Sequence, residues 1–283
     1  DLTGSSMANG TDGVIYTGID ADGQLGLVAL TGVGDLNGDG LSDFAFTAPR
    51  AQTDPGNQDS LEPGRTYVIF GDTNRTALKA VTLGGLDGSD GFMLEIDALQ
   101  DLVPGFVGPN YQGEMVVGGA GDVNGDGFDD FIPVVRDVLG NPLNADTPPT
   151  GIHPASILGA SRAAINFGSA DLDDRVLGQD GPVLLLPAPL LNDSVFGSRT
   201  VFGEPGDLNN DGIDDIILSV SLQGSEVNSG DTFLQEGVYV IFGRETWDGA
   251  IDVVTEADLI LTDFPNGVPL YATAAGDVDG QGA

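Results

Sequence analysis

Hydrophobic and polar positions alternate along the chain in short runs, with no long helical stripe. Apolar segments of about five to eight residues are separated by clusters of Gly, Asp, Asn and Pro, which is the pattern of β-strands joined by turns. No stretch keeps an apolar period of about 3.6 residues between capping residues, as an amphipathic helix would. The pattern therefore predicts an all-β protein.

Four such runs recur in the same order in three units. In the first unit they read LGLVALTGV, DFAFTAP, GRTYVIFG and GFMLEID, and the third run ends in Phe-Gly in every unit. Four short runs separated by turn residues predict a four-stranded antiparallel sheet. Repeats of such sheets around an axis form a β-propeller. The sequence thus predicts a β-propeller of four-stranded antiparallel blades.

The two ends of the chain carry parts of further units. Three complete blades are predicted, at residues 24–97, 112–190 and 196–265. Residues 1–23 contain DGVIYTGID, which resembles the fourth run of a unit and predicts the outer strand of a preceding blade. Residues 266–283 contain a first run and predict the start of a further blade. Because open blades expose strand edges, we expect neighbouring sequence or another copy of the chain to complete them.

The connection between the first and second runs is rich in Asp in every unit. It reads GDLNGDGLSD from Gly34, GDVNGDGFDD from Gly121 and GDLNNDGIDD from Gly206, with a shortened copy, GDVDGQGA, from Gly276. Counted from the first Asp, side-chain oxygens stand at places one, three, five and nine, and the Gly at place six permits a sharp turn. The first Asp recurs after 87, 85 and 70 residues, intervals that indicate repeated supersecondary units.

This spacing predicts a metal-binding loop. Hard cations such as Ca²⁺ take about six to eight oxygen ligands from carboxylates, amides, backbone carbonyls and water. A polar hairpin turn is the alternative for a single copy, but repetition of all four oxygen positions favours the ion site. We expect three Ca²⁺ sites and a fourth that is cut short. The predicted ligands, with the backbone carbonyl at place seven, are Asp35, Asn37, Asp39, Leu41 and Asp43; Asp122, Asn124, Asp126, Phe128 and Asp130; Asp207, Asn209, Asp211, Ile213 and Asp215; and Asp277 and Asp279.

EF-hand and dockerin loops begin with the same spacing, but the residues that follow do not fit them. An EF-hand needs an acidic residue at place twelve, on a helix that follows the loop. Here place twelve is Phe46, Pro133 and Leu218. Each lies in a strand-like run, and Pro133 would break a helix. The loops are therefore predicted to join two strands.

The net negative charge of the chain disfavours some classes of binding partner. Lys and Arg number 9 against 44 Asp and Glu, for a formal net charge of −35. Such a surface repels nucleic acids and anionic membranes, and the sequence has no run of about 18 apolar residues for membrane insertion. The absence of Cys excludes disulfides, thiolate metal sites and a cysteine nucleophile.

The loops and their flanking runs resemble the FG-GAP repeat. The resemblance rests on GDVNGDGFDD, on DFAFTAP, whose end is nearest the Gly-Ala-Pro of the family, and on the later YVIFG. It implies the propeller of integrin alpha subunits and of many bacterial extracellular proteins, with Ca²⁺ bound between the first two strands of a blade. The second and third units depart from the family at Ala-Pro, and the family's seven blades do not fit into 283 residues of this pattern.

These features lead us to expect an extracellular, calcium-binding propeller at the cell surface. It would act in adhesion, as a scaffold or in filament assembly, with proteins, polysaccharides or other copies of itself as partners and with Ca²⁺ in a structural role. No enzyme is expected, because the single His, His153, lies in a Pro-rich insertion and no G-x-S-x-G elbow accompanies it. Two alternatives stay open: a polysaccharide hydrolase or lyase with a carboxylate pair, and a carbohydrate-binding propeller.

Weaker signals are interpreted as structural. The Asp-rich segments IDADGQLG, residues 19–26, and LDGSDG, residues 86–91, lack the alternate spacing of the loops. Trp247 is interpreted as covering a blade edge, with sugar stacking as the alternative. The aromatic residues of the Phe-Gly ends are predicted to pack in the core rather than to form a ligand platform; they are Phe70, Phe167 and Phe242.

Overall fold

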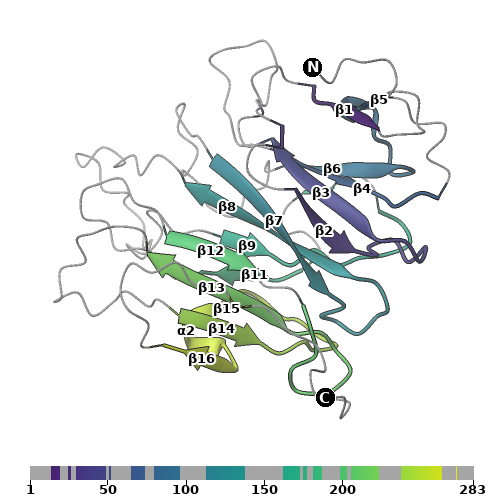
Figure 1. Ribbon diagram of the computed structural model, residues 1–283. Helices are drawn as coiled ribbons and strands as arrows, with labels where there is room; N and C mark the ends of the chain where they lie inside the picture. Colours follow the sequence, from purple (N-terminus) through teal and green to yellow (C-terminus); the bar gives the residue numbers. More distant parts are fainter. Residues whose placement is uncertain are drawn as a thin grey trace, which may run out of the picture.

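The protein is described here from a computed structural model. The structure describes residues 14–19, 25–26, 30–48, 51, 65–73, 80–95, 113–137, 162–172, 175–176, 181–186, 198–202, 205–222, 237–262 and 272. The regular elements of these residues are almost all β-strands, as predicted (Figure 1). None of the helices among them is long and apolar enough to cross a bilayer.

Three antiparallel sheets follow one another along the chain, and Figure 1 shows them side by side in sequence order. Each contains the four runs that the sequence predicts, paired in chain order. The first sheet holds β2 (Leu30–Gly34), β3 (Asp43–Ala48), β4 (Arg65–Ile69) and β6 (Gly91–Glu95). The second holds β7 (Gly113–Gly121), β8 (Asp130–Asp137), β9 (Arg162–Ala164) and β11 (Val183–Leu185). The third holds β12 (Ser198–Phe202), β13 (Ile216–Leu222), β14 (Gly237–Ile241) and β16 (Leu259–Leu261).

A short parallel strand, which the sequence pattern did not predict, joins each sheet to its neighbour. β10 (Arg175–Val176), from the second unit, pairs with β6 of the first sheet. β15 (Ile251–Asp252), from the third unit, pairs in the same way with β11. β5 (Ala80–Thr82), from the first unit, pairs with β1 (Ile15–Thr17), the strand expected to belong to a preceding blade. Each unit thus extends the outer edge of the sheet before it.

The outer strand of the third sheet has no such parallel partner among the described residues. Its three apolar side chains, Leu259, Ile260 and Leu261, are 46%, 40% and 47% exposed. In contrast, Leu94 of β6 and Leu184 of β11 are fully buried. Leu185 of β11 is 39% exposed although β15 pairs with that strand, so an edge strand does not by itself cover every apolar side chain.

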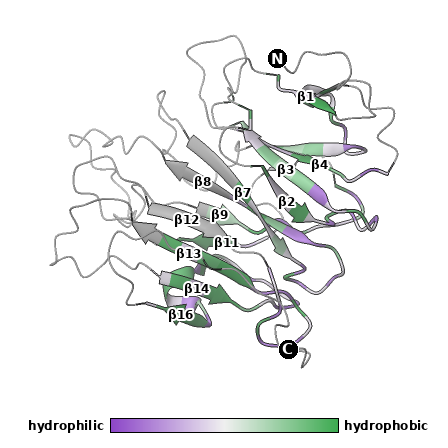
Figure 2. Cartoon of the chain, viewed as in Figure 1, coloured by the Kyte–Doolittle hydropathy of each residue, from purple (hydrophilic) through white to green (hydrophobic). Residues whose placement is uncertain are grey.

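Three hydrophobic cores lie between successive layers of sheet. One combines β3, β4 and β6 with residues of the second unit, including Val117 and Phe131. Another combines the second and third sheets, and a third packs Tyr67 and Ile69 of β4 toward Tyr16 of β1. β4 is buried along its whole length because its two faces contribute to different cores. In Figure 2 hydrophobic colours prevail on β4 and β14, and hydrophilic positions lie at the connections between strands.

Helical structure in the described chain is limited to single turns. α2 (Val253–Glu256) follows β15, and the Asp252 carboxylate caps it by accepting a hydrogen bond from the Val254 N–H at 3.0 Å. η3 (Leu83–Gly85) is a 3₁₀ turn between β5 and β6. Both are too short to show a helical period in the sequence.

Candidate metal-binding loops

The first Asp-rich loop joins β2 to β3, and its side-chain oxygens turn inward onto its own backbone. The Asp35 carboxylate accepts hydrogen bonds from the N–H groups of Asp39, at 3.0 Å, and Gly40, at 2.8 Å. The Asn37 side-chain oxygen accepts from the same Asp39 N–H, also at 3.0 Å. Oxygens of places one and three therefore converge on one point of the loop. The Asp39 carboxylate accepts from the Leu41 N–H at 2.8 Å.

The second and third loops repeat this pattern bond for bond. They join β7 to β8 and β12 to β13, at equivalent points of their sheets. In both loops the N–H of place five donates to the oxygens of places one and three within 2.9–3.0 Å. The Gly N–H of place six donates to the first Asp at 2.8 Å in both. Place six itself has positive φ, at 86° for Gly40, 92° for Gly127 and 93° for Gly212, a conformation that favours glycine.

The carboxylate at place nine is buried and ties the loop to the Phe-Gly end of the third run. Asp130 accepts hydrogen bonds from the N–H of Val123 at 2.9 Å and from the N–H of Gly168 at 2.8 Å. Asp43 makes the equivalent bonds at 2.9 and 2.7 Å, and Asp215 at 2.7 and 2.9 Å. This second role of the place-nine carboxylate was not predicted from the sequence.

Burial raises the pKa of these ninth-place carboxyl groups. Desolvation is the largest cause for Asp130, whose pKa rises to about 8, and for Asp43, whose pKa rises to about 6. The pKa of Asp215 is raised for the same reason. The two backbone N–H donors oppose each rise, and the carboxylates of places one and five add to it by repulsion. Each loop therefore places a carboxylate where its negative charge is costly.

The donor set of each loop suits Ca²⁺ by its chemistry, since three carboxylates and an amide are hard oxygen ligands. Within the described ranges, no three acidic side chains are already grouped as an ion would hold them. Their oxygens instead accept the backbone N–H groups given above, and each carboxylate oxygen keeps further lone pairs. The metal sites therefore stay a prediction. The partial fourth loop, with Asp277 and Asp279, lies outside the described residues.

Neighbouring loops contact each other directly. The carboxylate of Asp129, at place eight of the second loop, accepts a hydrogen bond from the Asp35 N–H at 2.6 Å, and the Asp129 N–H donates to the Asp35 carbonyl at 3.1 Å. Asp214, at place eight of the third loop, makes the same two bonds with Asp122, at 3.1 and 3.0 Å. Burial raises the pKa of Asp214. Sequence reasoning assigned no role to these two residues.

Place seven packs on the preceding loop as well. The Phe128 ring lies over Gly38, where a β-carbon would come within 2.6 Å of it, and Ile213 lies over Gly125, where the distance would be 3.3 Å. Both side chains therefore act in packing between loops. The sequence predicts their backbone carbonyls as ligands, and the packing of the side chains does not test that prediction.

Trp247 belongs to the contact between the second and third units rather than to an open sugar-stacking surface. Its indole N–H donates to the Val123 carbonyl at 3.1 Å, and its ring packs against the core between the second and third sheets. The Arg244 guanidinium lies 4.6 Å from the ring centroid, and the Arg244 N–H donates to the same Val123 carbonyl at 2.9 Å. Trp247 thus covers the second loop.

The weaker sequence signals have mixed outcomes. Of the Phe-Gly aromatics, Phe70 is buried and Phe167 packs against a core as predicted, whereas Phe242 is only half-buried. In LDGSDG, Asp87 accepts hydrogen bonds from the Ser89 side chain and N–H, which lower the pKa of Asp87 and mark a turn. His153 lies outside the described residues, as do most residues of IDADGQLG.

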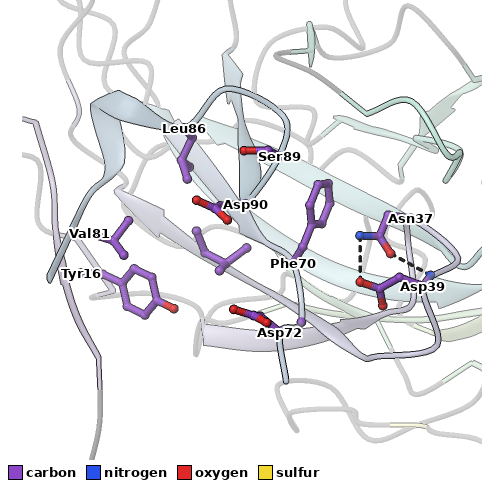
Figure 3. A pocket seen from close by; sticks show the side chains of 11 residues that line it. Tyr16, Asn37, Asp39, Phe70, Asp72, Val81, Leu86, Ser89 and Asp90 are labelled. Carbon is purple, nitrogen blue, oxygen red and sulfur yellow. Dashed lines mark hydrogen bonds between the residues drawn. The ribbon is translucent and has the colours of Figure 1, made fainter. Parts of the chain in front are cut away.

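A cavity of about 300 Å³ lies beside the first loop, between β1, β5 and the β4–β6 region. Figure 3 shows Tyr16 and Val81 on one side of it, Asn37 with Asp39 on the other, and Asp72 and Asp90 between them. Asp72 and Asp90 are not among the predicted metal ligands. The cavity lining therefore includes two carboxyl groups besides that of Asp39.

The comparison with protein families gives a match that covers the first loop and its strands. Residues 29–60 match the family described as FG-GAP repeat. The chain thus carries an FG-GAP repeat, as the sequence resemblance indicated, and its second and third loops have the same hydrogen bonds as the matched one. A search of curated proteins gives no match.

Proposed function

We propose that the chain is a calcium-binding β-propeller module that works outside the cell as an adhesion, scaffold or surface-assembly unit. The FG-GAP repeat supports a propeller of this kind, because such repeats occur in extracellular and surface proteins and are typically not catalytic. Three sheets with the same strand order, and hydrophobic cores between neighbouring sheets, also support a propeller. The formal net charge of −35 disfavours nucleic-acid and anionic-membrane partners.

One observation carries the calcium proposal: three loops have the same inward hydrogen bonds and the same buried ninth-place carboxylate. A bound Ca²⁺ would supply positive charge that offsets carboxylate repulsion and holds the loop backbone by coordination. In the first loop Asp35, Asn37, Asp39, the Leu41 carbonyl and Asp43 would hold it. The fold alone raises the pKa of Asp43 and Asp130, so a cation beside them would relieve an existing cost.

Calorimetric titration of the chelator-treated chain with Ca²⁺ tests the metal part of the proposal. We expect three ions per chain, with one site lost in each of the variants Asp39→Asn, Asp126→Asn and Asp211→Asn. These place-five residues are exposed, so the variants should fold. Asp87→Asn removes the same charge from a turn outside the loops and should leave three ions. No measurable binding at millimolar Ca²⁺ would overturn the proposal.

A glycan array and sedimentation of the calcium-loaded chain test the partner class. Binding of a polysaccharide or a defined self-assembly, lost in EDTA, supports an adhesion or assembly role for the calcium-held form. A monomer that binds no glycan and captures no cell-surface protein in Ca²⁺ would contradict that role. These outcomes are independent of the ion count.

The cavity beside the first loop favours polysaccharide binding or hydrolysis as the second candidate function. Two carboxyl groups of its lining, Asp72 and Asp90, are of the type that glycoside hydrolases use in pairs. Asp90→Asn would then abolish release of reducing sugar from an acidic or neutral polysaccharide, while the ion count stays at three. Absence of sugar release by the unsubstituted chain excludes the hydrolase.

A further inference from the structure

Asp129 and Asp214 each belong to two loops at once. Asp129 stands between Phe128 and Asp130, the proposed ligands at places seven and nine of the second loop, while its carboxylate holds the Asp35 N–H of the first loop at 2.6 Å. Asp214 stands between Ile213 and Asp215 of the third loop and holds the Asp122 N–H of the second at 3.1 Å. In both cases the receiving residue is the proposed ligand at place one.

The contact between loops is a connected set of bonds rather than one carboxylate. The N–H of each place-eight Asp returns a hydrogen bond to the place-one carbonyl, at 3.1 and 3.0 Å. The residue after the Phe-Gly turn donates to the place-two carbonyl, from Ser169 to Leu36 at 2.9 Å and from Arg244 to Val123 at 2.9 Å. The side chain of place seven packs on the Gly at place four of the preceding loop. Both pairs of loops share this arrangement.

We infer that Asp129 and Asp214 are positioning residues that couple neighbouring calcium sites, so that an ion in one loop raises the affinity of the loop before it. The inference rests on the proposed calcium function. An ion in the third loop would fix the backbone on both sides of Asp214 and so fix the carboxylate that holds Asp122. The second loop then loses less conformational freedom when it binds its own ion. In the same way, an ion in the second loop would fix Asp129 and raise the Ca²⁺ affinity of the first loop.

The coupling has to be reciprocal, because the free energy that links two binding sites is the same in both directions. The first loop ends the series in the described chain, since its place eight is Ser42 rather than Asp. Ser42 therefore offers a matched position where substitution removes no carboxylate that contacts another loop. The second loop has a neighbour on each side, so its Ca²⁺ affinity should change when a ligand is removed from either the first or the third loop.

The chain contains a built-in reporter for the second loop. Trp247 is the single Trp, and its indole N–H is bonded to the carbonyl of Val123, which lies between the proposed ligands Asp122 and Asn124. Its emission should therefore change when the second loop binds Ca²⁺. The first loop is a whole sheet away, so its ion should contribute little to the signal.

The test is a Ca²⁺ titration of the full chain followed by Trp247 emission, with calorimetry in parallel. Asp211→Asn removes a proposed ligand of the third loop, and Asp211 makes its hydrogen bonds with Asp207, Asn209 and Ile213 of that same loop. We expect it to move the Trp247 midpoint to Ca²⁺ concentrations about fivefold higher or more, the lower range of measured site-to-site coupling. Asp214→Ala should give a similar shift, and Ser42→Ala none.

The double variant Asp211→Asn with Asp214→Ala separates coupling through Asp214 from direct charge effects. If Asp214 carries the coupling, removal of the third ion has no further effect once Asp214 is gone. Asp214→Asn, which keeps an oxygen acceptor for the Asp122 N–H, should restore most of the affinity and guards against a folding defect in the Ala variant. A merely structural role would change the melting temperature without this pattern of midpoints.

Each result has a separate meaning. An unchanged Trp247 midpoint in Asp211→Asn, in a chain that still binds ions by calorimetry, overturns the coupling and leaves the calcium function standing. If Asp211→Asn shifts the Trp247 midpoint by the same factor in the Asp214→Ala background as in the unsubstituted chain, the role of Asp214 is overturned. A chain that binds no Ca²⁺ by either method overturns the proposed function and the inference together.

Discussion

The carboxylate of Asp129 accepts a hydrogen bond from the backbone N–H of Asp35, 94 positions earlier in the chain. The N–H of Asp129 donates in return to the Asp35 carbonyl. This pair connects two sheets at their Asp-rich loops, and Asp214 with Asp122 repeats it in the next pair of sheets. The loops are therefore also the contacts by which neighbouring sheets are aligned.

The buried carboxylate at place nine should be needed even without an ion. Asp130→Ala leaves the Gly168 N–H without its acceptor and the Val123 N–H with the Gly121 carbonyl alone, at 3.1 Å. The one unsatisfied buried donor should cost about 1–3 kcal/mol in unfolding free energy. Asp130→Asn keeps one oxygen acceptor and should cost clearly less. Urea unfolding in EDTA measures both. Equal losses in the two variants would contradict the assigned hydrogen bonds.

The stability of the calcium-free protein should fall as the pH rises from 5 to 8. The pKa of Asp130 is about 8 in the fold against an ordinary value of 3.8, and that of Asp43 is about 6. Protons therefore bind more tightly to the folded state, so the stabilisation present below pH 3.8 is lost as the pH passes through the folded pKa values. Thermal unfolding in EDTA across this range measures the slope.

The variant Asp130→Asn serves as the control for the pH prediction, because its amide does not titrate. Its melting temperature should fall less between pH 5 and 8 than that of the unsubstituted chain. Added Ca²⁺ should stabilise more at pH 8 than at pH 5, since ligands must lose their protons to bind metal. An equal pH slope in both chains would contradict the assignment to Asp130.

Two glycines of the first loop should differ in their tolerance of a side chain. Both have positive φ, 72° at Gly38 and 86° at Gly40, so Ala costs about 1–2 kcal/mol at either for its backbone conformation. At Gly38 the new β-carbon also meets the Phe128 ring, whereas at Gly40 nothing lies within 4 Å. Gly38→Ala should therefore lower the melting temperature more than Gly40→Ala. The reverse order would contradict the packing of Phe128 on the first loop.

The place-two side chains of the loops should contribute unequally to stability. Leu36 is fully buried beneath the second unit, whereas Leu208, at the same place of the third loop, is 50% exposed. Leu36→Ala should cost about 2–5 kcal/mol, as for other buried leucines, and Leu208→Ala less than about 1 kcal/mol. Chemical denaturation of both variants provides the measurement. Similar losses at the two positions would mean that Leu208 is covered in solution.

Much of the fold can be predicted from the sequence because strand and turn residues follow a simple period. The run DFIPVVRD corresponds to β8 residue for residue. β10 and β15 could not be found in this way, because two residues are too few to show any alternation. Their pairing depends on where the preceding sheet places its outer edge, which is a property of the packed units.

The sequence also shows the spacing of the predicted ligands, but it does not show the contacts that these residues make. Asp43, Asp130 and Asp215 are recognisable as the last oxygens of a predicted metal loop, yet their bonds to the Phe-Gly ends involve residues 28 to 38 positions away. Asp129 and Asp214 gave one signal that went unused, since the second and third loops end in two acids and the first in Ser-Asp. The difference can be interpreted only from the packed sheets, where the extra acid contacts the neighbouring loop.

Thermal unfolding of the chain in excess Ca²⁺ and in EDTA tests the central claim most directly. One site stabilises the fold by about 2.7 kcal/mol at an ion concentration 100 times its Kd. With about 2–4 °C per kcal/mol for a domain of roughly this size, three sites should raise the melting temperature by more than about 10 °C. The variant Asp39→Asn with Asp126→Asn and Asp211→Asn should show no such rise. An identical melting temperature in Ca²⁺ and EDTA for the unsubstituted chain would contradict the account.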